Sequence, residues 1–212
     1  MIIINLKNYK IGKEVFDFVK KIEIYYNKAI IAVPAIELSD CVKNVGPNMQ
    51  VYAQHVDYNE KGKGTGFVVP ESLINAGVVG SLLNHSEHKI SMTEIRKTMK
   101  RCNEAGLKII VCCSSLREAI QIKKLNPYAM AFEDKKLIAT GKSITEHRQH
   151  DIKKFAELLK DSSIIPLCGA GISSGEDVAH ALLLGCKGVL VSSVVANSQT
   201  PEKFLKEVQG IL

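Results

Sequence analysis

Eight short apolar runs alternate with longer segments of helical periodicity along this chain, and this alternation restricts its fold more than any other feature. The apolar runs predict strands at 2–5, 29–32, 50–54, 79–84, 108–113, 128–132, 163–168 and 188–191. Helices are predicted near 13–26, 39–45, 70–76, 93–105, 115–124, 147–159, 175–184 and 201–209. Strands that are apolar along their whole length are typical of a parallel sheet covered by helices on both faces.

The eight strand–helix units account for nearly all of the 212 residues. We therefore predict an α/β fold in which residues 1–212 form a single domain, a closed (β/α)8 TIM barrel with eight parallel strands each followed by a helix. An open, doubly wound sheet is the alternative. That fold normally has a glycine-rich turn after its first strand, whereas this chain has "NLKNYK" there.

Several residues have the chemistry of helix ends. Candidates for helix starts are Ser39, Thr93 followed by Glu94, Ser115 followed three residues later by Glu118, and Pro201 in a first turn. Candidates for left-handed residues just past helix ends are Gly106, Gly185 and Gly210. These positions agree with the predicted helix boundaries.

Composition excludes several classes of protein. The chain is 46% hydrophobic and 24% charged, as in an ordinary globular protein that buries a large core. No apolar run approaches the about 20 residues of a membrane span, and Asn5 and Lys7 interrupt the apolar start, so we predict a cytoplasmic protein. A net charge of +6 suits an anionic substrate. Because no basic run is combined with aromatic stacking residues, we expect no nucleic-acid partner.

The six cysteines, at positions 41, 102, 112, 113, 168 and 186, have no C-x-x-C spacing. Most of them lie in apolar runs, which predicts buried, reduced thiols and not disulfides or a zinc site. His147 and His150 could lie one turn apart on a helix, but no third ligand accompanies them. We therefore expect no metal.

Polar side chains follow the predicted strands at their carboxyl ends, where barrel enzymes have their active sites. Asn5 and Lys7 follow the first strand and are expected on one side of it, because alternate residues of a strand share a face. The segment "NHSEHK" places His85 and Glu87 after the fourth strand, and Glu133 follows the sixth. The simpler alternatives are a solvated Lys7, a His85 bonded to a backbone carbonyl in the core, and a Glu133 in an exposed loop.

These side chains suit acid–base chemistry. If a helical turn began at His85, its N–H groups and dipole would disfavour the imidazolium and leave a neutral ring able to donate to a carbonyl. Apolar surroundings would raise the pKa of Glu133 and strengthen it as a general base. The segment "EDKKLIATG" that begins at Glu133 has the composition of an active-site lid, the alternative being an exposed loop.

Two segments rich in small residues follow the last two strands. In "GAGISSGEDV", Gly169 and Gly171 would let the backbone approach an anion, although a tight turn alone could also need them. The segment "SSVVAN" provides further N–H groups and hydroxyls. Barrels commonly bind phosphate with these two loops.

Seven motifs occur in an order that resembles the triosephosphate isomerase family, specifically its compact archaeal type. They are "INLKNY", "AQHVD", "GTG", "NHSE", "FE…LIATG", "CGAGISSGEDV" and "GVLVSS", and they extend over essentially the whole chain. The resemblance implies an intramolecular aldose–ketose isomerase of glycolysis and gluconeogenesis. It would interconvert dihydroxyacetone phosphate and D-glyceraldehyde 3-phosphate through an enediolate, with neither a metal nor an organic cofactor.

The resemblance also implies roles for individual residues. Glu133 resembles the base that moves a proton between C1 and C2, and His85 resembles the neutral electrophile that serves O1 and O2. Asn5 and Lys7 would bind the substrate and stabilise the enediolate, with Glu87 in support. The positions that match the family's other phosphate-binding residues are Ile138, Ala139, Gly171, Ser192 and Ser193.

The segment "QHVDYNEKGKGTG" resembles the loop that reaches into a partner subunit, so the resemblance implies a homodimer or homotetramer with the loop around Thr65 at the interface. The chain departs from the usual family pattern at Asp134, Ala139, His88 and Val194, most of which belong to the lid or the phosphate loops. A non-catalytic barrel that binds a phosphosugar or a protein partner is the alternative, as is another phosphate-handling barrel enzyme.

Overall fold

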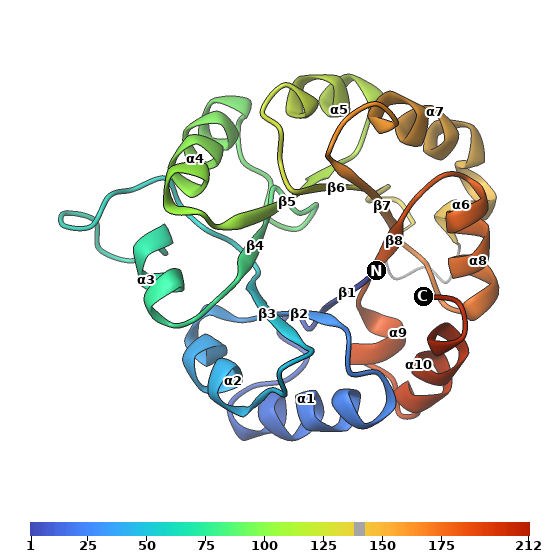
Figure 1. Ribbon diagram of the computed structural model, residues 1–212, viewed down its shortest axis with the longest axis horizontal. Helices are drawn as coiled ribbons and strands as arrows, with labels where there is room; N and C mark the ends of the chain where they lie inside the picture. Colours follow the sequence, from blue (N-terminus) through green and yellow to red (C-terminus); the bar gives the residue numbers. More distant parts are fainter. Residues whose placement is uncertain (138–142) are drawn as a thin grey trace.

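The computed structural model describes residues 1–137 and 143–212, and its strands close into a parallel barrel. The strands are β1 (Ile2–Asn5), β2 (Ile30–Val33), β3 (Gln50–Ala53), β4 (Gly80–Leu83), β5 (Lys108–Cys113), β6 (Ala129–Phe132), β7 (Ile165–Gly169) and β8 (Gly188–Val191). Each strand pairs with the next one along the chain, and β8 pairs with β1 to complete the ring. Figure 1 shows the strands at the centre and the helices as an outer layer. The predicted (β/α)8 barrel is confirmed.

The helices lie between the strands as expected. They are α1 (Lys13–Tyr25), η1 (Ala35–Glu37), α2 (Leu38–Asn44), α3 (Pro70–Asn75), α4 (Met92–Ala105), α5 (Leu116–Lys123), α6 (Ile144–His147), α7 (Gln149–Leu159), α8 (Gly175–Leu183), α9 (Ser193–Ala196) and α10 (Pro201–Gln209). The helix expected at 147–159 is interrupted by Arg148, whose backbone is not helical. The short helices η1, α6 and α9 were not predicted, because one turn is too short to show a periodic pattern.

Some of the predicted helix ends are confirmed and others are wrong. Ser115 caps α5, Pro201 begins α10, and Gly106 and Gly185 are left-handed. The start of α4 is capped by Ser91 instead of Thr93, and α2 begins at Leu38 without a cap from Ser39. Gly210 is not left-handed, because the chain continues in a turn in which the N–H of Leu212 donates to the Val208 carbonyl at 3.0 Å.

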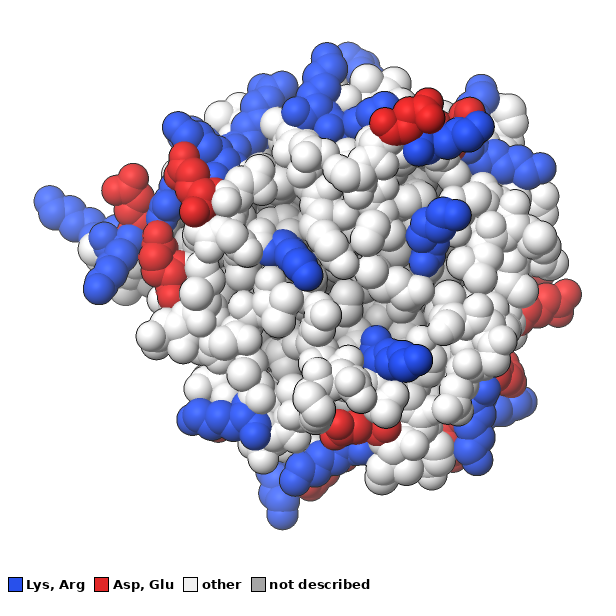
Figure 2. All heavy atoms as spheres, viewed as in Figure 1, with Lys and Arg blue, Asp and Glu red and all other residues white. Residues whose placement is uncertain are grey.

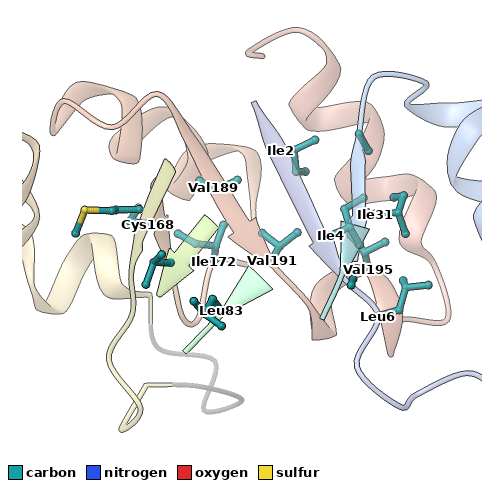
Figure 3. Close-up of a cluster of buried hydrophobic side chains, with 14 of the residues drawn as sticks. Ile2, Ile4, Leu6, Ile31, Leu83, Cys168, Ile172, Val189, Val191 and Val195 are labelled. Atoms are coloured by element: carbon teal, nitrogen blue, oxygen red, sulfur yellow. The ribbon is translucent and has the colours of Figure 1, made fainter. Parts of the chain in front are cut away.

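Alternation along the strands divides the buried side chains into two layers. The interior of the barrel is filled by Ile3, Ile30, Ala32, Tyr52, Leu82, Ile110, Cys112, Ala129, Ala131, Leu167 and Leu190. The residues between these point outward and pack against the helices. Figure 3 shows part of this outer layer, where Ile2 and Ile4 of β1 lie near Val191 of β8 and Val195 of α9.

The same alternation directs polar residues into the carboxyl end of the barrel. In β6 the side chains of Ala129 and Ala131 face the interior, so Glu133, two residues further, continues on that side. Asn5 follows Ile3 in the same way at the end of β1. Burial of the barrel interior therefore determines where these polar groups lie.

All six cysteines are buried and unpaired, as predicted. Burial raises the pKa of Cys102 to about 12, which leaves its thiol protonated at neutral pH. Within residues 1–137 and 143–212, no three His, Cys, Asp or Glu side chains are grouped so that they could hold a metal ion.

Charged side chains are distributed around the helical periphery. On the face shown in Figure 2, basic side chains stand apart from one another near the centre and lie closer together along the upper edge. None of the helices in the described part of the chain has both the length and the apolar character needed to cross a membrane.

Candidate active site

The described candidate residues meet in one hollow at the carboxyl ends of the strands. Asn5, Lys7, His85 and Glu133 line a cavity of about 40 Å³. The rest of its lining comes from the segments after β7 and β8, namely Ala170, Gly171 and Ile172, Leu190 and Val191 of β8, and Ser192 and Ser193. A hollow of about 340 Å³ adjoins it, shares Asn5, Lys7 and His85, and also includes Glu87. The predicted positions Ile138 and Ala139 lie outside the described residues.

His85 and Glu133 face each other inside this cavity. His85 Nε2 lies 3.6 Å from Glu133 Oε1, and the two side chains are 9% and 6% exposed. The other carboxylate oxygen, Glu133 Oε2, is buried and has no hydrogen-bond partner among the described residues. A buried carboxylate oxygen without a donor is unfavourable, so this position suits a polar group of a ligand.

Gly169 makes room for the carboxylate. A Cβ at this position would lie 2.8 Å from the Leu190 carbonyl oxygen and 3.2 Å from Glu133 Oε1. Any side chain would therefore press on both the barrel wall and Glu133. The sequence analysis assigned this glycine to anion binding, whereas its closest contacts are with the carboxylate and with β8.

His85 lies in a loop and not at the start of a helix. The N–H of His88 donates to the His85 carbonyl at 2.8 Å to close a single turn, and α4 begins only at Met92. The expected effect of a helix end on the ring is therefore absent. In its place the Glu87 N–H donates to His85 Nδ1 at 3.3 Å, a contact that requires an unprotonated Nδ1 and so favours the neutral ring.

The pKa of His85 nevertheless lies above its ordinary value. Burial lowers this pKa, but the contact with Glu133 and the negative charges of Glu133 and Glu87 raise it by more, against a smaller lowering by Lys7. In the ligand-free site, the Glu87 N–H contact thus favours the neutral ring, whereas the carboxylates of Glu133 and Glu87 favour the protonated ring. A bound molecule that separated His85 from Glu133 would weaken the effect of Glu133 and so lower the pKa of His85.

Lys7 is held by contacts on both its side chain and its backbone. Its Nζ lies 2.7 Å from Glu87 Oε1, and only 14% of the side chain is exposed. Its φ is +47°, a left-handed conformation that is uncommon for a lysine. Asn5 Oδ1 accepts from the Lys7 N–H at 3.0 Å, and Gln54 Nε2 donates to the Lys7 carbonyl at 3.0 Å. These contacts direct the ammonium group toward the cavity.

Asn84 organises the loop that carries His85. It is 1% exposed and left-handed, with a φ of +59°. Its Nδ2 donates to the Cys112 carbonyl at 2.8 Å and to Glu118 Oε1 at 2.7 Å, while its Oδ1 accepts from the Ile90 N–H at 3.2 Å. The sequence analysis gave no role to Asn84 or Gln54 and treated Glu118 only as a helix cap, although an asparagine at a strand end is a known marker of left-handed backbone.

The other wall of the cavity consists mainly of backbone. Ala170 and Gly171 are both left-handed, with φ of +79° and +73°. Ser192 directly precedes α9, and its Oγ is buried without a hydrogen-bond partner in the described part of the chain. Val194 does not line the cavity, because its side chain packs against the outer hydrophobic layer.

Two histidines border the adjoining hollow. The rings of His55 and His88 are stacked with their centroids 4.2 Å apart, and His55 Nε2 lies 3.2 Å from Asp57 Oδ1. Burial lowers the pKa of His55, and Asp57 only partly opposes this change. His88, one of the predicted departures from the family pattern, thus packs on a neighbouring ring.

A larger hollow of about 870 Å³ lies elsewhere, between α7 and α8. It is lined by lysines and aliphatic side chains, and Glu157 is the one carboxylate among its described lining residues. An imidazole and a carboxylate in contact are typical of an acid–base site, and they occur in the cavity at the barrel mouth. We therefore regard that cavity as the candidate active site.

Comparison with known proteins leads to one family. Residues 1–209 match the family model described as triosephosphate isomerase. A triosephosphate isomerase of Thermoplasma volcanium is 36% identical over 210 residues, covering 98% of each chain. One of Sulfurisphaera tokodaii is 37% identical over 98% of this chain and 93% of its own, and one of Methanopyrus kandleri is 38% identical over 84% and 80%. With this match over nearly its full length, the chain belongs to the triosephosphate isomerase family.

Proposed function

We propose that this protein interconverts dihydroxyacetone phosphate and D-glyceraldehyde 3-phosphate through an enediolate, in glycolysis and gluconeogenesis. The observation that carries the proposal is the buried pair of His85 Nε2 and Glu133 Oε1, 3.6 Å apart at the mouth of a closed barrel. Membership of the family adds support, since its curated relatives are named for this reaction.

Glu133 is the proposed base. It removes a proton from C1 of the ketose and returns it to C2, which requires an ionised carboxylate directed at the carbon chain of the substrate. The support is the position of Glu133 Oε2, which is buried and lacks a partner among the described residues. A carboxylate with few hydrogen bonds is a stronger base than a solvated one once water is excluded.

His85 is the proposed electrophile that transfers protons between O1 and O2. Its Nδ1 accepts from the Glu87 N–H, so the proton of a neutral ring resides on Nε2 and can be donated to a substrate oxygen. A substrate bound between His85 and Glu133 would also separate the two side chains, which weakens the influence that raises the pKa of His85.

Lys7 and Asn5 are proposed to stabilise negative charge on the substrate, with Glu87 holding the ammonium group in place. Asn5 is 4% exposed and lies at the end of β1, and the Lys7 Nζ to Glu87 Oε1 contact of 2.7 Å fixes the cation at the edge of the cavity. A fixed cation stabilises a developing enediolate without reorganisation during the reaction. Because this stabilisation is electrostatic, the proposed reaction calls for neither a metal nor an organic cofactor.

The phosphate is proposed to bind at Gly171, Ser192 and Ser193, with Ile138 and Ala139 assigned from the family resemblance alone. The buried Ser192 Oγ, which lacks a described partner, supports an oxygen-rich ligand at this wall. Holding the phosphate and excluding water matter because an exposed enediolate phosphate would eliminate phosphate.

The assembly is proposed to be a homodimer or homotetramer in the cytoplasm, with each subunit forming one domain. Figure 1 shows the segment between β3 and α3 extending away from the barrel. Thr65 is exposed in this loop, and Phe67 is 50% exposed. At the base of the loop the Val68 N–H donates to Asp57 Oδ2 at 2.7 Å, so the projection is preformed and suited to insertion into a partner copy.

The proposed reaction is tested with the purified protein in deuterated water. Dihydroxyacetone phosphate should be converted to glyceraldehyde 3-phosphate with solvent deuterium at C2, and Glu133→Gln should lose at least several hundredfold of the rate, within the effect of a positioned general base. Equal rates for the two proteins would remove Glu133 from this role. Binding of 2-phosphoglycolate without any turnover would instead support a non-catalytic phosphosugar-binding barrel.

A further inference from the structure

Asp177 connects two chain segments that follow different strands, and the proposed acid–base chemistry does not use it. It is the third residue of α8 and is 8% exposed. Its Oδ2 accepts from the N–H of Ser173 at 2.8 Å, from Ser173 Oγ at 3.1 Å and from the N–H of Ser174 at 3.1 Å. Its Oδ1 accepts from Thr145 Oγ1 at 3.3 Å. Four donors from two segments therefore converge on one carboxylate.

Helix capping alone does not account for this arrangement, as a comparison with α4 makes clear. Both helices have a capping box, formed by Ser174 with Asp177 in α8 and by Ser91 with Glu94 in α4. Glu94 is exposed, and its carboxylate accepts from the Ser91 N–H at 2.8 Å as the box requires. Asp177 makes the same capping contact and adds contacts with Ser173 and Thr145.

The additional contacts surround the strained backbone of the wall that is proposed to bind phosphate, which is called the phosphate wall and comprises Ala170, Gly171, Ser192 and Ser193. Ala170 and Gly171 are consecutive left-handed residues, and this conformation is unfavourable for a residue that has a Cβ. Asp177 fixes the chain at Ser173, just after this pair. On the other side, the Ile144 N–H donates to the Ala170 carbonyl at 3.1 Å, and Ile144 is the residue before Thr145. The left-handed pair is thus held from both directions.

Asp177 does not line the cavity itself, so it does not contact a ligand there. Its carboxylate is ionised at neutral pH, since burial raises the pKa but the nearby Ser143 side chain and the hydrogen bonds from Ser173 and Ser174 lower it by more. Ser143 Oγ in turn lies 2.6 Å from Thr145 Oγ1, which orders the hydroxyl that contacts Asp177.

We propose that Asp177 is a positioning residue that holds Ala170 and Gly171 in the conformation that binds the substrate phosphate. This inference rests on the proposed function. The buried carboxylate of Asp177 would align the backbone N–H groups of this pair with an anion. It would act through Ser173 on one side and through Thr145 and Ile144 on the other. None of the described hydrogen bonds of Asp177 involves Asn5, Lys7, His85 or Glu133, so we expect the acid–base side of the cavity to work without it.

The test is Asp177→Asn, which keeps the size of the side chain but replaces one accepting oxygen with an NH2 donor. We expect the Kd for 2-phosphoglycolate, measured by calorimetry, and the KM for glyceraldehyde 3-phosphate to rise ten- to a hundredfold. For glyceraldehyde, which has no phosphate, kcat/KM should stay within twofold of wild type. A merely structural role would lower activity on both substrates equally.

Glu94→Gln in the α4 capping box is the matched control, and it should leave 2-phosphoglycolate binding unchanged. Thr145→Val removes the donor to Asp177 Oδ1 together with the contact of this hydroxyl with Ser143 Oγ. It provides a second variant if Asp177→Asn folds poorly, with a two- to fivefold rise in Kd expected. An unchanged Kd in the folded Asp177 or Thr145 variant, or an equal loss with glyceraldehyde, would overturn the inference.

The same measurements separate this inference from the proposed reaction. If the wild type bound 2-phosphoglycolate but turned over no triose phosphate, the proposed reaction would fail, and the Kd of the variants would still test Asp177. If the wild type bound no 2-phosphoglycolate, both proposals would fail.

Discussion

The two walls of the candidate active site are built from different parts of the chain. The acid–base wall consists of Asn5, Lys7, His85 and Glu133, and there side chains make the contacts. Lys7 Nζ lies 2.7 Å from Glu87 Oε1, and His85 Nε2 lies 3.6 Å from Glu133 Oε1. On the phosphate wall, the left-handed pair Ala170 and Gly171 presents mainly backbone to the cavity. The chemistry of the acid–base wall therefore depends on which side chains are present, whereas that of the phosphate wall depends on the conformation of its backbone.

This difference bears on Val194, one of the predicted departures from the usual family pattern. Val194 replaces a usual small residue near the phosphate wall, but its side chain packs against the outer hydrophobic layer and leaves the cavity free. The resemblance described in the sequence analysis predicts no such replacement at Asn5, Lys7, His85 or Glu133. A wall made of backbone tolerates such replacements as long as its dihedral angles are preserved.

After Glu133→Gln, the largest effect is expected from Lys7→Met, which removes the fixed cation and leaves Glu87 without its partner beside the substrate. We expect kcat/KM for glyceraldehyde 3-phosphate to fall at least a hundredfold, as for loss of one preorganised stabilising group. The coupled assay measures this loss, and Lys10→Met, outside the cavity, should stay within twofold. A loss below tenfold would show that the acid–base wall does not depend on this side chain.

A smaller effect is expected from Glu118→Gln, which acts on His85 through Asn84. The carboxylate of Glu118 accepts from Asn84 Nδ2 at 2.7 Å and from the Ser114 N–H at 2.8 Å, and an amide cannot accept at both of its ends. We expect kcat to fall about tenfold with KM within twofold, since misplacing a catalytic group affects the chemical step.

Lys89→Met is the control for this prediction, because Lys89 contacts the same carboxylate of Glu118 at 2.9 Å but not Asn84. It should leave kcat unchanged. If both variants lost the same activity, the charge near Glu118 and not the position of Asn84 would be the cause.

The pKa of His85 provides a test of electrostatics within the acid–base wall. In the ligand-free protein this pKa lies above 6.5, because the contact with Glu133 and the charges of Glu133 and Glu87 outweigh the effect of burial. The neutral ring that the reaction needs is then lost as pH falls through a value above 6.5, and kcat/KM should fall with it. Removing one negative charge by Glu87→Gln should lower the pKa of His85, so the fall of kcat/KM should also occur at lower pH.

Ring proton shifts of His85 by NMR measure this change directly, with a His85→Gln sample for assignment. The titrations of His147 and His150, which lie outside the cavity, serve as internal controls in the same spectra. An unchanged or higher pKa in Glu87→Gln would mean that Glu87 does not influence the ring.

The smallest effect is expected from Val194→Gly. Because Val194 packs outward and does not line the cavity, its removal should change the Kd for 2-phosphoglycolate by less than threefold. The loss of a partly buried side chain should instead lower the melting temperature, by a few degrees for about 1 kcal/mol. A tenfold tighter Kd would show that Val194 does restrict the phosphate wall.

Much of the fold and part of the site could be predicted from local sequence. The apolar runs located all eight strands because burial on both faces leaves a continuous pattern. Glu133 and Asn5 were identifiable because each ends such a run, and alternation along the strand directs both side chains inward. The helical turn considered at His85 is a single hydrogen-bonded turn that does not continue into a helix. The loop there is organised by Asn84, whose partner Glu118 lies 34 residues away.

The sequence by itself determined the order of strands and helices, the residues that face the barrel interior and the polar groups at the strand ends, because these depend on periodicities of a few residues. Only the tertiary structure decided the left-handed backbone of Lys7 and Ala170 and the contact of Asp177 with Thr145, 32 residues apart. Such features depend on hydrogen bonds between segments that become neighbours when the barrel closes, and short-range patterns contain no record of them.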